Sequence, residues 1–415
     1  MRKILLGTTG VVGAALIGMG AAHAQQAPTV RIGGFMNTAY NWVNDDADKA
    51  QGVPTGVNGA GRVARSRHDF RNEVEVHVFV TGKAANGLSY GAVMEIQNDN
   101  VGGGSGSALD FDEAYGFVSS PTLGTLRFGE EDNAAAIMQV RVPTITGLGP
   151  DGDFDDGMLS LANSTGNASP SLLTGINDGN DSTKIIYLSP QFFGFDFGVS
   201  YAPTSSGEGE RLWVGRQIDT LTVGGTGLPV SNTQRDRTAG RNELSGALRY
   251  RGSFGNVGVA AGFGAMFVNG AESTATGVPT SARNISAYTA GLNVTAFGFT
   301  LGGEYTWGNY SGVSVGRASL AEGRDSSNHW VLGATYTVAA WSFGGFYGVA
   351  KQDNGPGVGD REQTIWGVGT AYSLAPGLEL FANYNRLKDE NTFVIGTTPF
   401  NRDADVVYAG ARLAF

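Results

Sequence analysis

Apolar and polar side chains alternate with a period of two along stretches of about ten to thirteen residues through most of this chain. In residues 71–81, for example, Val74, Val76 and Val78 share one face, while the intervening side chains are mostly polar. The pattern returns in residues 88–97, 299–307 and 407–415. A period of two is that of a β-strand, whose successive side chains point to opposite faces of the sheet.

The length of these stretches separates two classes of β protein. Strands of soluble domains typically have about five or six residues, whereas a tilted strand needs about ten to cross a bilayer. The sequence therefore predicts membrane-crossing strands with one face toward lipid. The other face carries Gly, Ser, Thr, Asn and charged residues, and we expect it to be free of bulky apolar groups.

Breaks in the alternation predict sixteen strands. Their expected spans are 29–43, 69–82, 87–99, 108–120, 124–132, 183–190, 194–203, 240–252, 254–267, 284–296, 297–310, 326–338, 339–351, 361–374, 377–389 and 402–415. Short turns alternate with long polar loops, as expected for periplasmic turns and extracellular loops. Since an open sheet edge cannot lie in hydrocarbon, the fold class is an all-β, closed antiparallel transmembrane barrel, wide enough for an aqueous channel.

The first 24 residues have the pattern of a secretory signal peptide. Arg2 and Lys3 precede an uncharged apolar stretch, and Ala22-His23-Ala24 matches a cleavage site. An uncleaved membrane anchor is the alternative. We expect residues 1–24 to be removed and residues 25–415 to form the barrel.

Charge and cysteine content argue against a nucleic-acid-binding protein and against a disulfide-stabilised fold. Cleavage removes two of the 28 basic residues, and 26 against 38 acids gives −12. That charge argues against nucleic-acid binding, which needs a basic surface. The chain has no cysteine, so no disulfide holds the exported fold.

Several segments in order resemble the Gram-negative general porins, particularly those of alphaproteobacteria. The resemblance covers essentially residues 25–415, and its carrying segments are 112–117 (DEAYGF), 124–129 (GTLRFG), 185–190 (IIYLSP), 194–201 (GFDFGVSY) and the terminal Phe415. It implies a homotrimer of sixteen-stranded channels in the cell outer membrane, surrounded by lipid bilayer and lipopolysaccharide. In that family the barrel-assembly machinery reads the terminal aromatic residue.

The resemblance also implies that the third long loop folds into the lumen as a constriction. The corresponding loop is residues 133–183, the longest in the chain. Loops beyond about fifteen residues are usually functional or disordered. The Pro-Glu-Phe-Gly-Gly motif of enterobacterial members is absent from this loop, so its residues cannot be matched one by one.

Four acids in this loop, Asp151, Asp153, Asp155 and Asp156, are candidate constriction residues that attract cations. A solvated loop tip is the equally open alternative. The spacing of Asp151, Asp153 and Asp155 also partly matches a calcium loop. The match fails at Asp156, where Gly is expected, and at Ala162, where Glu is expected. An irregular Ca²⁺ site remains an option, and no other cofactor is expected.

The candidate pore-wall residues lie on or just before the strands expected at the start of the chain. They are Arg65, Arg67, Arg71, Arg127, Glu73, Glu75, His77 and Glu95. The resemblance implies wall arginines opposite loop acids, which would create a field across the pore. The alternative is internal pairing of these arginines with Glu73, Glu75 or Glu95.

These patterns favour a passive porin for small hydrophilic solutes and ions, with a modest cation preference. A solute-selective channel with a lumenal binding site is the first alternative. An outer-membrane enzyme has only the neighbouring His68 and Asp69 as a hint, and a surface-binding barrel has none. We expect the aromatic residues at strand ends to form interfacial belts outside the barrel: Tyr305, Trp307, Tyr336 and Trp341.

Overall fold

The structure is a computed structural model of the full chain. It describes residues 26–46, 66–98, 110–150, 154–155, 158, 161–163, 166–168, 171–176, 181–204, 218–223, 226–231, 240–270, 283–310, 326–354, 357, 359–395 and 398–415. The predicted signal peptide, residues 1–24, lies outside the described residues and stays a prediction.

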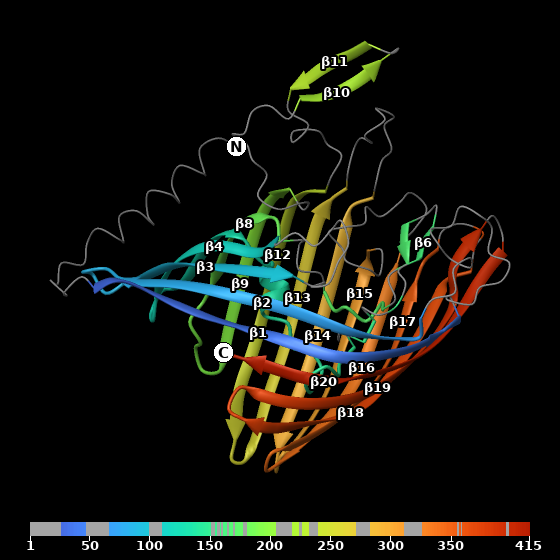
Figure 1. The fold of residues 1–415 in the computed structure, drawn as a ribbon. Coiled ribbons are helices and arrows are strands. Elements are labelled where there is room, and N and C mark those ends of the chain that lie inside the picture. The colour runs from blue at the N-terminus through green and yellow to red at the C-terminus, as the bar shows by residue number, and fades with distance from the viewer. Residues whose placement is uncertain are drawn as a thin grey trace.

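Sixteen strands form one closed barrel (Figure 1). They are β1 (Gln26–Asp45), β2 (His68–Lys83), β3 (Ser89–Asn98), β4 (Asp110–Ser120), β5 (Gly124–Glu130), β8 (Thr183–Leu188), β9 (Phe195–Thr204), β12 (Arg241–Phe254), β13 (Val257–Asn269), β14 (Ile285–Ala296), β15 (Phe299–Asn309), β16 (Ser327–Val338), β17 (Trp341–Gln352), β18 (Arg361–Ala375), β19 (Leu378–Ile395) and β20 (Thr398–Ala414). All sixteen predicted strands are confirmed, most within three residues of their expected ends.

The first and last strands close the barrel. β1 pairs antiparallel with β20 from Phe35↔Ala414 to Asp45↔Ala404. A buried ion pair joins the same two strands, with Arg402 Nε 3.0 Å from Asp45 Oδ1. At the other end of the seam, the backbone of Phe415 exchanges two hydrogen bonds with Gly34. Closure leaves neither edge strand unpaired, as hydrocarbon requires.

Alternation separates an outer from an inner face, as predicted. On β9 the exposed Phe195, Phe197 and Tyr201 point outward, and the buried Asp196 and Ser200 point inward. Large apolar side chains on an exposed outer face suit a lipid environment.

The four belt aromatics also lie on the outer face, since they alternate with inward residues on β15, β16 and β17. Tyr305 stacks on Trp307 with ring centroids 5.0 Å apart, and Phe299 stacks on Tyr336 at 4.2 Å. Their outward placement, which the sequence predicted, excludes them from any sugar-stacking track inside the barrel.

The structure also contains elements that the sequence did not predict. They are α2 (Ala134–Ile137), β6 (Leu161–Asn163), β7 (Gly166–Ala168), β10 (Ile218–Val223) and β11 (Thr226–Ser231). β10 and β11 form a separate hairpin that stands off from one end of the barrel (Figure 1). Among the described residues, no helix is long and apolar enough to cross a membrane.

One expectation about the inner face is wrong. Bulky apolar side chains point inward from β16 to β20, and they include Val331, Phe346, Ile365, Leu387 and Val406. They pack against apolar residues of the long third loop in one buried cluster. Because the loop brings its own apolar groups inside the barrel, this part of the lining is a core and not a wet surface.

Candidate functional site

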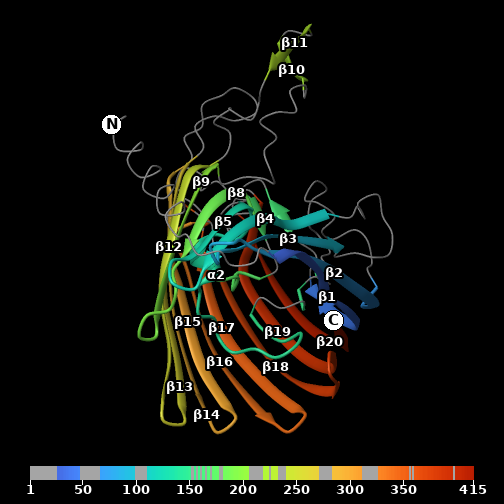
Figure 2. The ribbon, with the colours of Figure 1, turned by 90° about the vertical axis from the view of Figure 1, so that its left-hand side faces the viewer.

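The third loop begins inside the barrel with the short helix α2. The Asn133 side chain caps it by accepting hydrogen bonds from the backbone N–H groups of Ala135 and Ala136, at 3.0 and 3.1 Å. The backbone N–H of Ala134 donates to Ser200 on the inner face of β9, at 3.0 Å. Ala134 and Ala135 are completely buried. The loop is therefore attached to the wall from its first turn, and Figure 2 shows α2 within the barrel.

Beyond α2 the chain lies across inward-facing glycines of β13, β14 and β15. A Cβ at Gly291 would overlap the carbonyl oxygen of Val140. A Cβ at Gly262 would lie 2.9 Å from Val140 Cγ2, and one at Gly302 would lie 2.8 Å from Pro143 Cδ. The absence of side chains at these positions forms the space that the loop occupies. We call the inner faces of β13–β15, with Gly262, Gly291 and Gly302, the glycine wall.

A buried carboxylate on this wall holds the middle of the loop. Glu304 accepts hydrogen bonds from Arg141 Nη2 at 3.2 Å and from the Val142 backbone N–H at 3.0 Å. The Asn293 amide donates to the Arg141 carbonyl at 2.8 Å. Arg141 also donates to the Leu173 carbonyl at 2.8 Å and so joins the two halves of the loop. Charge-assisted contacts of this kind fix orientation as well as contributing energy.

The rest of the loop has further anchors. The Asn383 amide donates to the Thr146 carbonyl at 3.1 Å, and the Thr146 hydroxyl donates to Glu379. Phe154 and Leu172 are buried in the apolar cluster. The Leu172 N–H donates to Gln363 on β18, at 2.7 Å. The inward-folded loop implied by the family resemblance is therefore present in the described part of residues 133–183.

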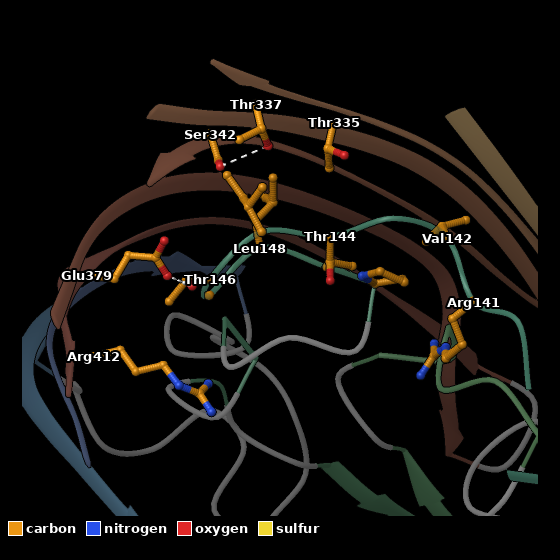
Figure 3. Close-up of a pocket in the computed structure, with 14 residues that line it drawn as sticks. Arg141, Val142, Thr144, Thr146, Leu148, Thr335, Thr337, Ser342, Glu379 and Arg412 are labelled. Carbon is orange, nitrogen blue, oxygen red and sulfur yellow. Dashed lines mark hydrogen bonds between the residues drawn. The ribbon is translucent and has the colours of Figure 1, made fainter. Parts of the chain in front are cut away.

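A cavity of about 600 Å³ lies between residues 141–150 of the loop and the inner face of the barrel. Hydroxyl groups of Thr335, Thr337 and Ser342 line its wall side. In Figure 3, Arg141 and Arg412 lie at opposite sides of this cavity, and Thr144 lies between them. The lining is polar and includes both charge signs, which suits water and hydrophilic solutes.

The wall formed by β2 and β3 carries acids instead of glycines. Glu73, Glu75 and His77 point inward from β2, and Glu95 points inward from β3 directly opposite His77. Asn37 on β1 donates to Glu73 at 2.7 Å. The side chains of Glu75, His77 and Glu95 are 15%, 23% and 18% exposed. We call Glu73, Glu75, His77 and Glu95 the carboxylate wall. The partial exposure of these side chains shows that the loop leaves this wall open to water.

The carboxylate wall faces the glycine wall across the barrel. β2 is second and β14 is tenth in the closed order of sixteen strands, which places them eight strands apart, half the circumference. Glu75 lies near the middle of β2, and Glu304 lies at the middle of β15. Loop residues with Arg141 therefore lie on one side of the barrel interior, and carboxylates lie on the other.

The predicted basic residues are placed differently from one another. Arg65 lies outside the described residues, and Arg67 is exposed just before β2. Arg71 is half-buried on the inner face of β2, opposite Ala39. Arg127 lies 2.5 Å from Glu131 and covers the Tyr115 ring, so it is in an internal ion pair, but not with Glu73, Glu75 or Glu95.

The predicted constriction acids are only partly described. Asp151, Asp153 and Asp156 lie outside the described residues, so their role in the pore and in calcium binding stays a prediction. Asp155 is half-buried, and its carbonyl accepts a hydrogen bond from the Met158 N–H at 2.8 Å. Phe154 and Met158, on either side, are buried in the apolar cluster. The described part of this segment is thus attached to the wall.

A group of acids at the base of the loop was missed from the sequence. One carboxylate oxygen from each of Glu113, Asp132 and Asp181 lies within 4.8 Å of the others. Burial raises the pKa of the Glu131 carboxyl, which follows β5, while Arg127 opposes that shift. The three residues lie at neighbouring ends of β4, β5 and β8, where Ala114 pairs with Glu130 and Glu130 with Thr183, so strand pairing brings them together.

Other residues of the site were missed for a different reason. Glu304 and Arg412 lie on inward faces that the alternation identifies, so the sequence did contain a signal for them. Arg141 lies in a loop, where no periodicity indicates direction.

The enzyme hint is not supported by the described contacts. His68 is exposed at the start of β2, with its ring 6.1 Å from that of Tyr40. Asp69 accepts a hydrogen bond from the Phe70 N–H at 2.8 Å. Hydrolytic catalysis needs a nucleophile aligned with a base and an orienting group, and these contacts do not form that arrangement.

Comparison with known proteins gives one family. A family model described as Gram-negative porin matches residues 11–392. A search of curated individual proteins found no match.

Similar solved structures show the same fold. An anion-selective porin from Comamonas acidovorans is 17% identical with a TM-score of 0.58, and the match covers 94% of this chain and 100% of that one. OmpT of Vibrio cholerae, in trimer form, is 13% identical with a TM-score of 0.55 and the same coverage. A mutant of the Rh. blastica porin is 15% identical with a TM-score of 0.50, covering 93% and 100%.

Proposed function

The chain belongs to the Gram-negative porin family, and on that premise we propose that it lets small hydrophilic solutes and ions diffuse passively through its barrel. Family and fold together make it a non-enzymatic outer-membrane porin channel. The observation that carries the proposal is the interior: one wall is covered by the loop, and the facing wall keeps half-buried acids open to water. Water beside a polar wall is what a passive channel needs.

We propose that the channel modestly prefers cations. The carboxylate wall presents Glu75 and Glu95, neither of which forms a salt bridge with Lys or Arg among the described residues. The guanidinium of Arg141 on the opposite side is paired with Glu304. Acidic groups lining a pore favour cations, and the full chain carries a net charge of −10. The anion-selective Comamonas porin is related at the level of fold alone.

Planar-bilayer recording of the purified protein tests the channel function. We expect large ohmic conductance steps that small neutral sugars and amino acids leave unblocked, and a reversal potential of cation-selective sign in a KCl gradient. Absence of conductance would refute the channel. An anion-selective sign would refute the cation preference alone and would indicate that the arginines control permeation.

A solute-selective channel is the second candidate, and the cavity beneath the loop favours it. Arg141, Arg412 and Glu379 line this cavity with several hydroxyl groups, an arrangement able to hold a polar solute in one orientation. Saturable block of the conductance by one sugar, amino acid or anion at low concentration would support this function over simple diffusion.

We further propose that the protein is a homotrimer exported with a cleaved signal peptide, residues 1–24, and contacting lipopolysaccharide. Phe415 is 60% exposed and pairs through its backbone with Gly34, so its ring is accessible for recognition during assembly. Mass spectrometry of the mature N-terminus and of the detergent-solubilised oligomer tests the first two points: Gln25 and a trimer are the expected results.

A further inference from the structure

Three side chains of the carboxylate wall form a group that the channel function does not explain. Glu75 and His77 are two residues apart on β2, and Glu95 is the cross-strand partner of His77 on β3. Residues two apart on a strand share a face, so all three side chains converge inside the barrel. One nitrogen or oxygen atom from each residue lies within 4.8 Å of the others.

The imidazole lies between the two carboxylates. His77 Nε2 is hydrogen-bonded to Glu75 Oε1, and His77 Nδ1 lies 3.6 Å from Glu95 Oε1. His77 is the basic partner of both carboxylates, and neither forms a salt bridge with Lys or Arg among the described residues. Two acids this close repel each other unless a proton or a cation lies between them.

The three side chains are accessible from the lumen. On the β1 side, His77 is opposite Gly33, where a Cβ would lie 3.0 Å from a guanidinium nitrogen of Arg31. The Arg31 guanidinium covers the Phe79 ring at 3.9 Å and forms no salt bridge with Glu75 or Glu95 among the described residues. All three candidate ligands are partly exposed, so an ion in the lumen can reach them.

We propose that Glu75, His77 and Glu95 bind a divalent transition-metal ion of the zinc type on the pore wall. One imidazole nitrogen with two carboxylate oxygens suits Zn²⁺ or its neighbours, whereas Mg²⁺ and Ca²⁺ select oxygen ligands alone. Three protein ligands leave a position for water, as in open zinc sites. Ligand atoms about 2.1 Å from the ion are about 3.4 Å apart in a tetrahedron, so small side-chain rotations complete the site.

Metal binding also has a consequence for permeation. A dication bound between the two acids neutralises their charge. Cations passing along the carboxylate wall would then lose the attraction of these acids, so the bound ion lowers cation flow. This effect on conductance rests on the proposed channel function, whereas binding of the ion does not.

The test measures Zn²⁺ binding and Zn²⁺ block on the same protein. Isothermal titration of the detergent-solubilised protein with ZnCl₂ is expected to give one site per chain. In planar bilayers, micromolar ZnCl₂ in a non-chelating buffer is expected to reduce the conductance in a saturable way. The variant His77→Ala is expected to raise the midpoint of both titrations at least about 10-fold, since even residues supporting a ligand affect affinity by that much.

The chain offers a matched control at the start of the same strand. His68 is exposed and lies away from the three ligands, so His68→Ala is expected to leave both titrations unchanged. Glu95→Gln keeps the side-chain shape and is expected to weaken binding as His77→Ala does. MgCl₂ at the same concentration is expected to leave the conductance unchanged.

Three results would overturn the proposal. They are no heat of Zn²⁺ binding, equal midpoints in the wild-type protein and His77→Ala, or an equal effect of MgCl₂, which would indicate charge screening. Conductance of the wild-type protein without ZnCl₂ reports the channel function separately. A protein that conducts and ignores Zn²⁺ contradicts only the metal site, and one that binds Zn²⁺ without conducting contradicts only the channel.

Discussion

The glycine wall and the carboxylate wall face each other across the same barrel, yet the third loop packs on the first and leaves the second exposed to water. Gly262, Gly291 and Gly302 present no side chains, so the backbone of the third loop lies directly on the sheet. Glu75 and Glu95 present charged side chains that need water or a cation. The difference shows how a uniform barrel acquires an off-centre channel: the loop packs where side chains are absent, and solvent stays where charges are.

The largest expected effect comes from loosening the loop where its apolar side chains are buried. Phe154 is completely buried in the cluster beneath the loop. Replacing a buried Phe by Ala costs about 3–5 kcal/mol, so Phe154→Ala is expected to release this segment and increase open-channel current noise. The control Phe254→Ala alters a ring that is 65% exposed and is expected to leave the noise unchanged. Unchanged current noise in both variants would contradict the claim that packing of Phe154 holds the loop in place.

Removing the carboxylate on the glycine wall tests the polar anchor. Glu304→Gln weakens charge-assisted hydrogen bonds to Arg141 and Val142, each worth about 2 kcal/mol, and leaves the Arg141 charge unbalanced. We expect a reversal potential shifted toward anions. Glu390→Gln makes the same charge change at an exposed position and should leave the reversal potential as it was. Equal shifts in both variants would show that Glu304 acts only through net charge.

A single methyl group tests the fit between the loop and the glycine wall. Gly291→Ala places a Cβ on the Val140 carbonyl, and overpacking of this kind costs about 1–3 kcal/mol. We expect the loop to shift and the unit conductance to change. Gly258→Ala adds the same methyl group to the inner face of β13, where the nearest atom is Thr295 Cβ at 3.6 Å. If both variants conducted like the wild-type protein, the loop would not lie on the glycines.

The smallest expected effect is on the carboxylate wall itself. A unit charge about 4 Å from an ion in water contributes about 1 kcal/mol, so Glu95→Gln should lower the cation-to-anion permeability ratio by up to about 5-fold. The reversal potential in a KCl gradient measures this ratio. Glu362→Gln, whose side chain is 57% exposed, is the control. An unchanged ratio in Glu95→Gln would exclude this wall from the permeation path.

Strands were predictable because their determinants are local. Alternation such as Val74, Val76 and Val78 against Glu75 and His77 identifies a strand and both of its faces without any tertiary information. Closure followed from the even strand count and from the cost of an open edge in hydrocarbon. The positions of Glu75, His77 and Glu95 inside the barrel needed nothing more than this periodicity.

The loop was less predictable because its path depends on contacts between distant residues. The position of Arg141 is set by Glu304, 163 residues later in the chain, and α2 is a single turn with little local signal. The inward Val331 and Ile365 were misjudged because an inner face was assumed to be wet throughout. Val331 and Ile365 are apolar because they pack against Phe154 and Leu172 of the loop in one buried cluster.

The most direct test determines which wall of the barrel borders the water. The chain has no cysteine, so single substitutions report one position each. A charged, membrane-impermeant thiol reagent is expected to reduce the conductance of Glu75→Cys rapidly and to leave Thr289→Cys, 3% exposed behind the loop on β14, unmodified. Equally fast modification of Thr289→Cys, or none of Glu75→Cys, would contradict the account, because the aqueous path would then follow the glycine wall.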